Sequence, residues 1–261
     1  MAFRCPIDAE KFASCKKEAL LLKESLDLLL GNFDRIKEWA DVDKWLRKVL
    51  RLFDEAATSY IPNKAVLFQR LAQCLSITLP TGIHNTVLKI YERILQNGQQ
   101  SSENLLNDFF YFSQGLFPFY RLCSNQFRPT VVGLLERFFL PLGADLGPAL
   151  PALLETLAPP LAENNEAIQK LTFAFLDRLC EHFPAPFVFC SLWMVIFRSP
   201  QCRYGCLKYL TFVLDRSAAG AIEEEEEEGV LRFSASSVGE EAGALGSELS
   251  MDVAELEGED S

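Results

Sequence analysis

The sequence contains little of what enzymes use most for metal and acid–base chemistry. It has only two histidines, His84 and His182, among 261 residues. It has no His-Glu-x-x-His, Gly-x-x-x-x-Gly-Lys or Gly-x-Ser-x-Gly pattern, and the isolated Ser14-x-x-Lys17 has no companion motif. We therefore expect a protein without enzymatic activity and without a cofactor. An enzyme with an unfamiliar site is the alternative.

Long apolar runs are also missing. No segment reaches the ~20 apolar residues that span a bilayer as a helix. The longest uncharged candidate, residues 183–197, is short and has Pro184 and Pro186 near its start. We predict that it forms a core helix shielded by neighbours on all sides, with Trp193 buried.

Charge is distributed unevenly along the chain. The net charge is −11, but residues 217–261 carry fourteen acidic residues against Arg232 alone, which leaves 24 basic and 22 acidic residues in 1–216. A nearly neutral body argues against nucleic-acid binding. Residues 217–261 contain six consecutive glutamates at 223–228 and few large apolar residues, so we predict a disordered acidic tail.

The eight cysteines follow no paired spacing, and residues 1–19 are polar and charged rather than a secretory signal. We expect reduced cytosolic thiols that pack as small hydrophobes. A possible metal set is Cys180, His182, Cys190, Cys202 and Cys206. The i, i+4 spacing of the last two also arises from core packing, and a Cys-x-x-Cys pair is missing, so we expect no metal.

The remaining periodicity is helical. The pattern predicts helices near 9–30, 39–57, 63–77, 83–97, 102–113, 118–125, 128–140, 146–158, 163–182, 185–198 and 202–215. Short breaks containing proline or glycine, including Pro118 and Pro159-Pro160, separate them. Antiparallel helix pairs of about 40 residues predict an all-α, HEAT- or armadillo-like α-solenoid over 1–216. A compact helical bundle is the alternative.

Prolines, glycines and a histidine lie at the predicted corners between helices. Prolines 80 and 141 and glycines 82 and 143 fit interhelical corners, where glycine permits a positive φ. His84, which follows such a corner, is expected to bond a backbone carbonyl and hold the corner.

A strip of four cations lies on the second predicted helix: Lys44, Arg47, Lys48 and Arg51. Their i, i+3, i+4, i+7 spacing puts them on one face, opposite an apolar face. An ordinary solvated face explains the pattern. The functional alternative is a docking strip for anionic lipid or an acidic partner.

The segment 61–84, which reads IPNKAVLFQRLAQCLSITLPTGIH, carries a family resemblance. Its Ile-Pro-x-Lys start, its Arg-Leu-Ala-Gln-Cys-Leu core at 70–75 and its Leu-Pro-Thr-Gly-Ile-His turn at 79–84 resemble the N-terminal signature of the Dopey family. In that signature the turn reads Leu-Pro-Ser-Gly-Val-His, so Thr81 and Ile83 depart from it. Further matches follow in family order over roughly residues 30–216, at 38–41, 91–92, 115–118, 138–143, 191–193, 199–200, and Gly205, Leu207, Tyr209 and Leu210.

The resemblance implies a non-enzymatic scaffold that works at the cytosolic face of Golgi and endosomal membranes in protein traffic between them. It also implies a large armadillo-repeat partner related to Arf exchange factors, a phospholipid flippase complex and contact with a Golgi phosphoinositide. Family members are much longer than this chain. A generic α-solenoid interaction module outside membrane traffic is the alternative function.

Overall fold

The structure is a computed structural model that describes residues 9–56, 58, 60–98 and 102–217, without the side chains of 9–16 and 102–104. Throughout these residues the regular structure is helical and includes no strand, which confirms the all-α prediction. The helices are α1 (Ala9–Phe33), α2 (Trp39–Glu55), α3 (Lys64–Cys74), α4 (Thr81–Gly98), α5 (Ser102–Leu122), α6 (Arg128–Leu134), the π-helical η1 (Leu135–Phe139), the 3₁₀ segment η2 (Leu140–Ala149), α7 (Leu150–Leu161), α8 (Glu166–Glu181) and α9 (Ala185–Arg198). The backbone is again helical over 200–217.

The chain divides into two compact units, Met1–Lys208 and Tyr209–Ser261. The sites described below lie in the first unit. The predicted acidic tail lies outside the described residues apart from Ser217, so the division into 1–216 and 217–261 stays a prediction.

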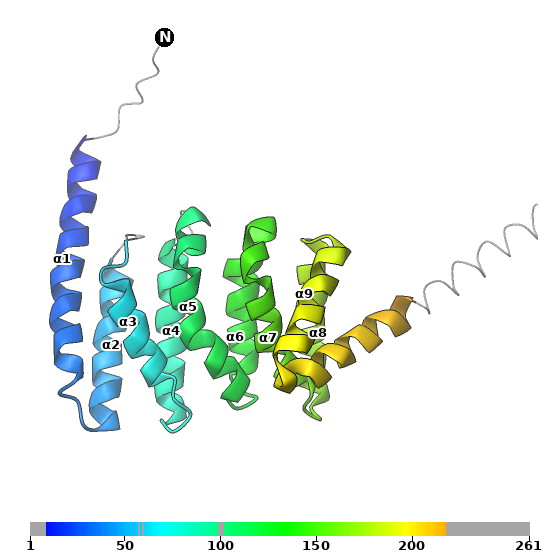
Figure 1. The fold of residues 1–261 in the computed structure, drawn as a ribbon. Helices are drawn as coiled ribbons and strands as arrows, with labels where there is room; N and C mark the ends of the chain where they lie inside the picture. Colours follow the sequence, from blue (N-terminus) through cyan, green and yellow to red (C-terminus); the bar gives the residue numbers. More distant parts are fainter. Residues whose placement is uncertain (1–8, 57, 59, 99–101, 218–261) are drawn as a thin grey trace, which may run out of the picture. The chain divides into compact units, whose positions relative to one another are not determined.

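Within the first unit, each helix packs on the helix two places further along the chain. One series runs α2, α4, α6, α8 and the other runs α3, α5, α7, α9. Figure 1 shows these helices standing next to one another in succession. Stacking of this kind buries one continuous core between neighbouring repeats. The predicted solenoid-like arrangement is confirmed.

Helix α2 shows why the segments pack in this way. Its buried side chains, Trp45, Leu46, Val49 and Phe53, recur every three or four residues and form one face. The Trp45 indole N–H donates to the Leu29 carbonyl at 2.9 Å, so the one polar atom of that face also has a partner. Charged side chains occupy the other face.

Phenylalanine, with 21 residues, supplies much of the core. The ring of Phe68 lies edge-on to that of Phe112 at 4.9 Å between centroids, and Phe112 meets Phe139 at 5.8 Å. Edge-to-face contacts of this kind add stability beyond the apolar area buried. The aromatic side chains thus join α3, α5 and η1.

One predicted break is wrong, because α5 continues through Pro118 as a single helix to Leu122. An interior proline removes one backbone hydrogen bond and costs about 3 kcal/mol. Around it Leu116, Phe119 and Tyr120 are fully buried, and burying side chains of that size offsets the loss. Similarly, α7 includes Pro159 and Pro160 in its last turn rather than ending before them.

The corner residues follow the prediction in part. Gly143 has φ +56° between two helical stretches, a conformation that glycine adopts without strain. Pro80 lies immediately before α4. Gly82, in contrast, lies in the first turn of α4 without a positive φ, so its expected left-handed role is wrong.

Candidate functional site

The four cations of the predicted docking strip lie exposed on α2, as their spacing requires. Three of them are paired with carboxylates of the same helix. Lys44 bonds Asp41 at 2.9 Å, while Arg47 and Arg51 contact residues four positions away. Those partners are Asp43 and Glu55, each at 2.7 Å. Among the described residues, Lys48 has no ion-pair partner.

This pairing changes the electrostatics of the strip. Helix α2 contains four cations and four carboxylates, so the helix as a whole carries no net charge. The hydrogen bond with Asp41 raises the pKa of the Lys44 ammonium, which therefore stays charged. Such exposed pairs are weak and exchange partners readily. The lipid- or partner-docking role of the strip stays a prediction.

The corner before α4 is held by His84, as predicted. Its Nε2–H donates to the Ser76 carbonyl at 2.8 Å, and the ring is buried edge-on between two phenylalanines. The ring centroids of Phe119 and Phe127 lie 5.0 and 5.5 Å away. These contacts account for His84 as a structural residue.

Other residues of the 61–84 segment also make structural contacts. Lys64 pairs with the buried Asp108 at 2.7 Å and thereby ties α3 to α5. Arg70 pairs with Asp34 at 2.8 Å, and its guanidinium lies 5.0 Å from the centroid of the Phe33 ring. The segment therefore connects its own helix pair to the helices on both sides.

Two glycines of the resemblance mark close packing. A Cβ on Gly115 would lie 2.2 Å from the hydroxyl of the buried Tyr91, and a Cβ on Gly205 would lie 1.8 Å from the Ala158 carbonyl oxygen. Neither contact leaves room for a side chain. These positions set the distance between the helices.

The thiols behave in the described part of the chain mostly as small apolar groups. Cys74, Cys123, Cys202 and Cys206 are buried, as predicted, whereas Cys190 is exposed. Burial raises the pKa of Cys74 and Cys206 to about 12, so both stay protonated and unreactive at neutral pH. No group of three or more metal-binding side chains occurs among the described residues, so the candidate set around Cys180 and His182 is not brought together.

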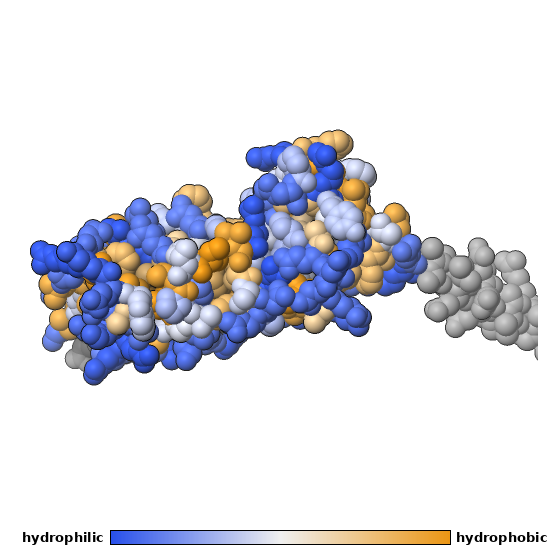
Figure 2. Space-filling view, turned by 90° about the horizontal axis from the view of Figure 1, so that it is seen from below, coloured by the Kyte–Doolittle hydropathy of each residue, from blue (hydrophilic) through white to orange (hydrophobic). Residues whose placement is uncertain are grey.

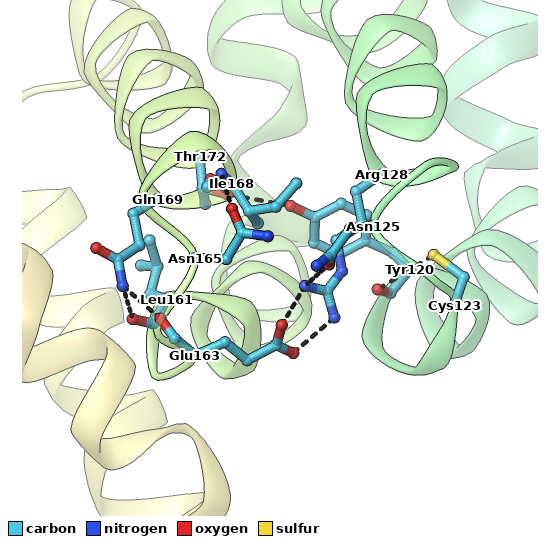
Figure 3. Close-up of polar contacts among 10 residues, drawn as sticks. All are labelled: Tyr120, Cys123, Asn125, Arg128, Leu161, Glu163, Asn165, Ile168, Gln169 and Thr172. Atoms are coloured by element: carbon cyan, nitrogen blue, oxygen red, sulfur yellow. Dashed lines mark hydrogen bonds and ion pairs between the residues drawn. The ribbon is translucent and has the colours of Figure 1, made fainter.

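A buried ion pair, which the sequence analysis missed, connects α6 to the turn between α7 and α8 (Figure 3). Arg128, whose side chain is only 4% exposed, binds both carboxylate oxygens of Glu163 at 2.5 and 2.6 Å. It also donates to Asn125 at 2.8 Å. The hydrogen bond from Arg128 lowers the pKa of the Glu163 carboxyl.

Neighbouring hydrogen bonds extend this cluster. Asn165 caps α8 by accepting from the Ile168 amide at 3.2 Å, and Gln169 donates to the carbonyls of Leu161 and Glu163. The hydroxyls of Tyr120 and Thr172 lie 3.1 Å apart. Figure 3 shows these side chains close together, between the helices that carry Tyr120 and Arg128 and the helix that carries Thr172. Except for the buried Arg128 Nε, which has no hydrogen-bond partner, these polar groups bond one another, so the cluster connects α5 and α6 to α8 and to the turn before it.

The prediction that Trp193 is buried is wrong. Its side chain is 48% exposed and stacks on Phe197, with 6.1 Å between ring centroids. Helix α9 buries its other face, which includes Leu192 and Ile196, and packs on α7. Because the helix is apolar on all sides, its sequence does not indicate which face is covered. The expectation of a helix shielded on every side is therefore corrected.

The fold and these contacts define a helical-repeat protein whose described polar clusters are structural. Among the described residues, no helix is long and apolar enough to cross a bilayer. The family model described as "Dopey, N-terminal" matches residues 16–254, and the chain belongs to this family.

Individual relatives agree with this assignment. Protein pad-1 of Caenorhabditis elegans is 32% identical over 195 residues, which are 74% of this chain and 8% of that protein. Protein DOP1B of Mus musculus is 33% identical over 75% of this chain and 8% of its own length. The DOP1 homolog of Drosophila melanogaster is 30% identical over 71% of this chain and 7% of its own length.

The chain thus spans less than a tenth of the curated relatives that it matches. None of these matches indicates an enzyme family. No solved structure matches significantly.

Proposed function

We propose that the chain is a non-enzymatic scaffold in protein traffic between Golgi and endosomes, associated peripherally with the cytosolic face of those membranes. The observation that carries the proposal is membership of the Dopey family over residues 16–254. The helical-repeat architecture supports it, because stacked helix pairs present extended surfaces for binding other proteins.

The proposed partners are those that the family resemblance implies. They are a large armadillo-repeat Golgi protein related to Arf exchange factors, a phospholipid flippase complex and a phosphoinositide-containing membrane. A role for the Lys44, Arg47, Lys48 and Arg51 strip in such contacts is part of the proposal. The whole relatives are more than ten times longer than the matched region, so their complete activities are proposals for this chain as well.

The experiment is localisation of the tagged chain combined with proximity labelling. We expect overlap with Golgi and endosomal markers, and labelling of trafficking proteins above the level obtained with the tag alone. A matched control is the chain with Gly115→Leu, which we expect to disrupt the contact with Tyr91 and so the fold. Diffuse distribution of the intact chain without labelled trafficking proteins would favour an interaction module outside membrane traffic.

A further inference from the structure

Helix α9 exposes a continuous apolar stripe along its whole length. The stripe consists of Phe187, Cys190, Trp193, Met194 and Phe197, all exposed. At 100° per residue these five positions fall within an arc of about 120°. Among the large apolar side chains that the structure describes, that of Phe197 is the most exposed, at 75%. An exposed set of this size on one face marks an interaction surface.

The charged residues of the segment that carries the stripe have one sign. From His182 to Lys208 the sequence contains no aspartate or glutamate, while Arg198, Arg203 and Lys208 are cationic. Both arginines are exposed. Arg203 Nε donates to the Ile196 carbonyl at 3.2 Å, which holds its guanidinium at the C-terminal end of α9.

Two carboxylates close to α9 in the sequence or by contact lie outside the stripe. Glu155 of α7 is half-buried and accepts a hydrogen bond from the Ser199 hydroxyl at 2.6 Å. Glu181 precedes α9 at the other end of the stripe. The surface is therefore apolar along the helix and cationic at its end.

Figure 2 views the molecule from below, where hydrophilic side chains cover much of the surface and hydrophobic ones gather in patches between them. In a two-fold contact the stripe of a second copy would present the same cationic end and no anionic partner for Arg198 and Arg203. An anionic bilayer supplies such partners. Tryptophan favours the depth of the lipid headgroups, other apolar side chains enter the acyl boundary, and guanidinium groups bind phosphate oxygens.

We propose that the α9 stripe is a membrane-contact surface that inserts shallowly into a bilayer carrying anionic phospholipid. The proposal rests on the peripheral membrane association of the proposed function and assigns a surface to it. This surface lies on a different helix from the cationic strip of α2.

The first experiment measures binding of the full chain to vesicles of phosphatidylcholine with and without phosphatidylserine. The stripe variant is Met194→Ser with Phe197→Ser, and the matched control is Phe110→Ser with Leu122→Ser, two similarly exposed side chains on α5. We expect the stripe variant to bind anionic vesicles at least about tenfold more weakly, because it loses two inserted apolar groups. The control is expected to stay within about twofold of the unchanged chain.

The second experiment tests depth and charge. Brominated lipids should quench the fluorescence of Trp193, so that the quenched component disappears in Trp193→Phe but persists in Trp39→Phe. Arg198→Gln should weaken binding to anionic vesicles about fivefold and leave binding to neutral vesicles unchanged.

Equal vesicle binding by the stripe variant and the unchanged chain, or no quenching of Trp193, would overturn the proposal. So would a dimer in sedimentation velocity that the stripe variant dissociates, since a second copy would then cover the stripe. The two proposals fail separately. If the chain localises to the Golgi but the stripe variant binds vesicles as well as the unchanged chain, only the proposed function is supported. If binding to vesicles depends on the stripe but the chain is diffuse in cells, only the α9 membrane-contact surface is supported.

Discussion

Helices α2 and α9 both bury one face in the solenoid and expose the other, but the exposed faces differ in chemistry. On α2 three of the four exposed cations are paired with carboxylates three or four positions away. On α9 the exposed residues are apolar except for Arg198 at the C-terminal end, and no carboxylate lies within the helix. Charged side chains on an exposed face can pair within their own helix or be hydrated. Exposed apolar side chains, in contrast, leave water only when another surface covers them.

The contrast between the two faces of α9 gives the largest expected effect. Leu192→Ala should destabilise the protein by about 2–5 kcal/mol, because it opens a cavity against α7. Trp193→Ala, one residue further, should cost less than about 1 kcal/mol, since half of the side chain is already in water. Urea unfolding of both variants measures the difference. Equal losses would mean that the exposed face is covered in solution.

The buried pair of Arg128 and Glu163 contrasts with the exposed pairs of α2. Glu163→Gln should cost about 1–3 kcal/mol at neutral pH, because the buried guanidinium loses a charged partner while the partly exposed carboxylate limits the effect. The reference is Glu166→Gln, which removes the carboxylate of the exposed pair with Lys170 and should cost less than about 0.5 kcal/mol.

The pH dependence of that loss follows from the lowered pKa of Glu163. A carboxyl whose pKa is lower in the folded state stabilises the protein fully above its unfolded pKa of about 4.3. The contribution disappears as the pH falls through the lower, folded pKa. The difference between the unchanged chain and Glu163→Gln should therefore shrink as the pH falls from 5 toward 3 in chemical unfolding. A difference that stays constant over this range would show that the ion pair contributes nothing to stability.

Local features were predicted from the sequence, and long-range ones were not. The amphipathic face of α2 and the corner bond of His84 depend on residues within eight positions of one another, so their spacing contains the information. The pair of Arg128 and Glu163 spans 35 positions, and no periodic pattern marks it. Pro118 predicts a break that the structure does not have, because local propensity ignores the packing on both sides of α5. The sequence does not predict which face of α9 is exposed, because a helix that is apolar on every side has no single apolar face.

The smallest expected effect concerns the α2 strip and decides between the two candidate membrane surfaces. The variant replaces Lys44, Arg47, Lys48 and Arg51 by Gln, and its control replaces the equally charged, exposed Lys17, Lys23, Lys37 and Lys170 by Gln. Both remove four positive charges, so any difference between them reports the position of the charges rather than their number.

Because three cations of the strip already have carboxylate partners, we expect the strip variant to weaken binding to anionic vesicles less than the α9 variant does. Raising the salt concentration should abolish this loss of vesicle binding, since the attraction between exposed charges is screened over about 8–10 Å near physiological ionic strength. A docking strip would instead lose about fivefold per cation relative to the control. Co-sedimentation with phosphatidylserine vesicles at low and high salt measures this. Equal binding by the strip variant and its control would identify the strip as the solvated face of a packed helix.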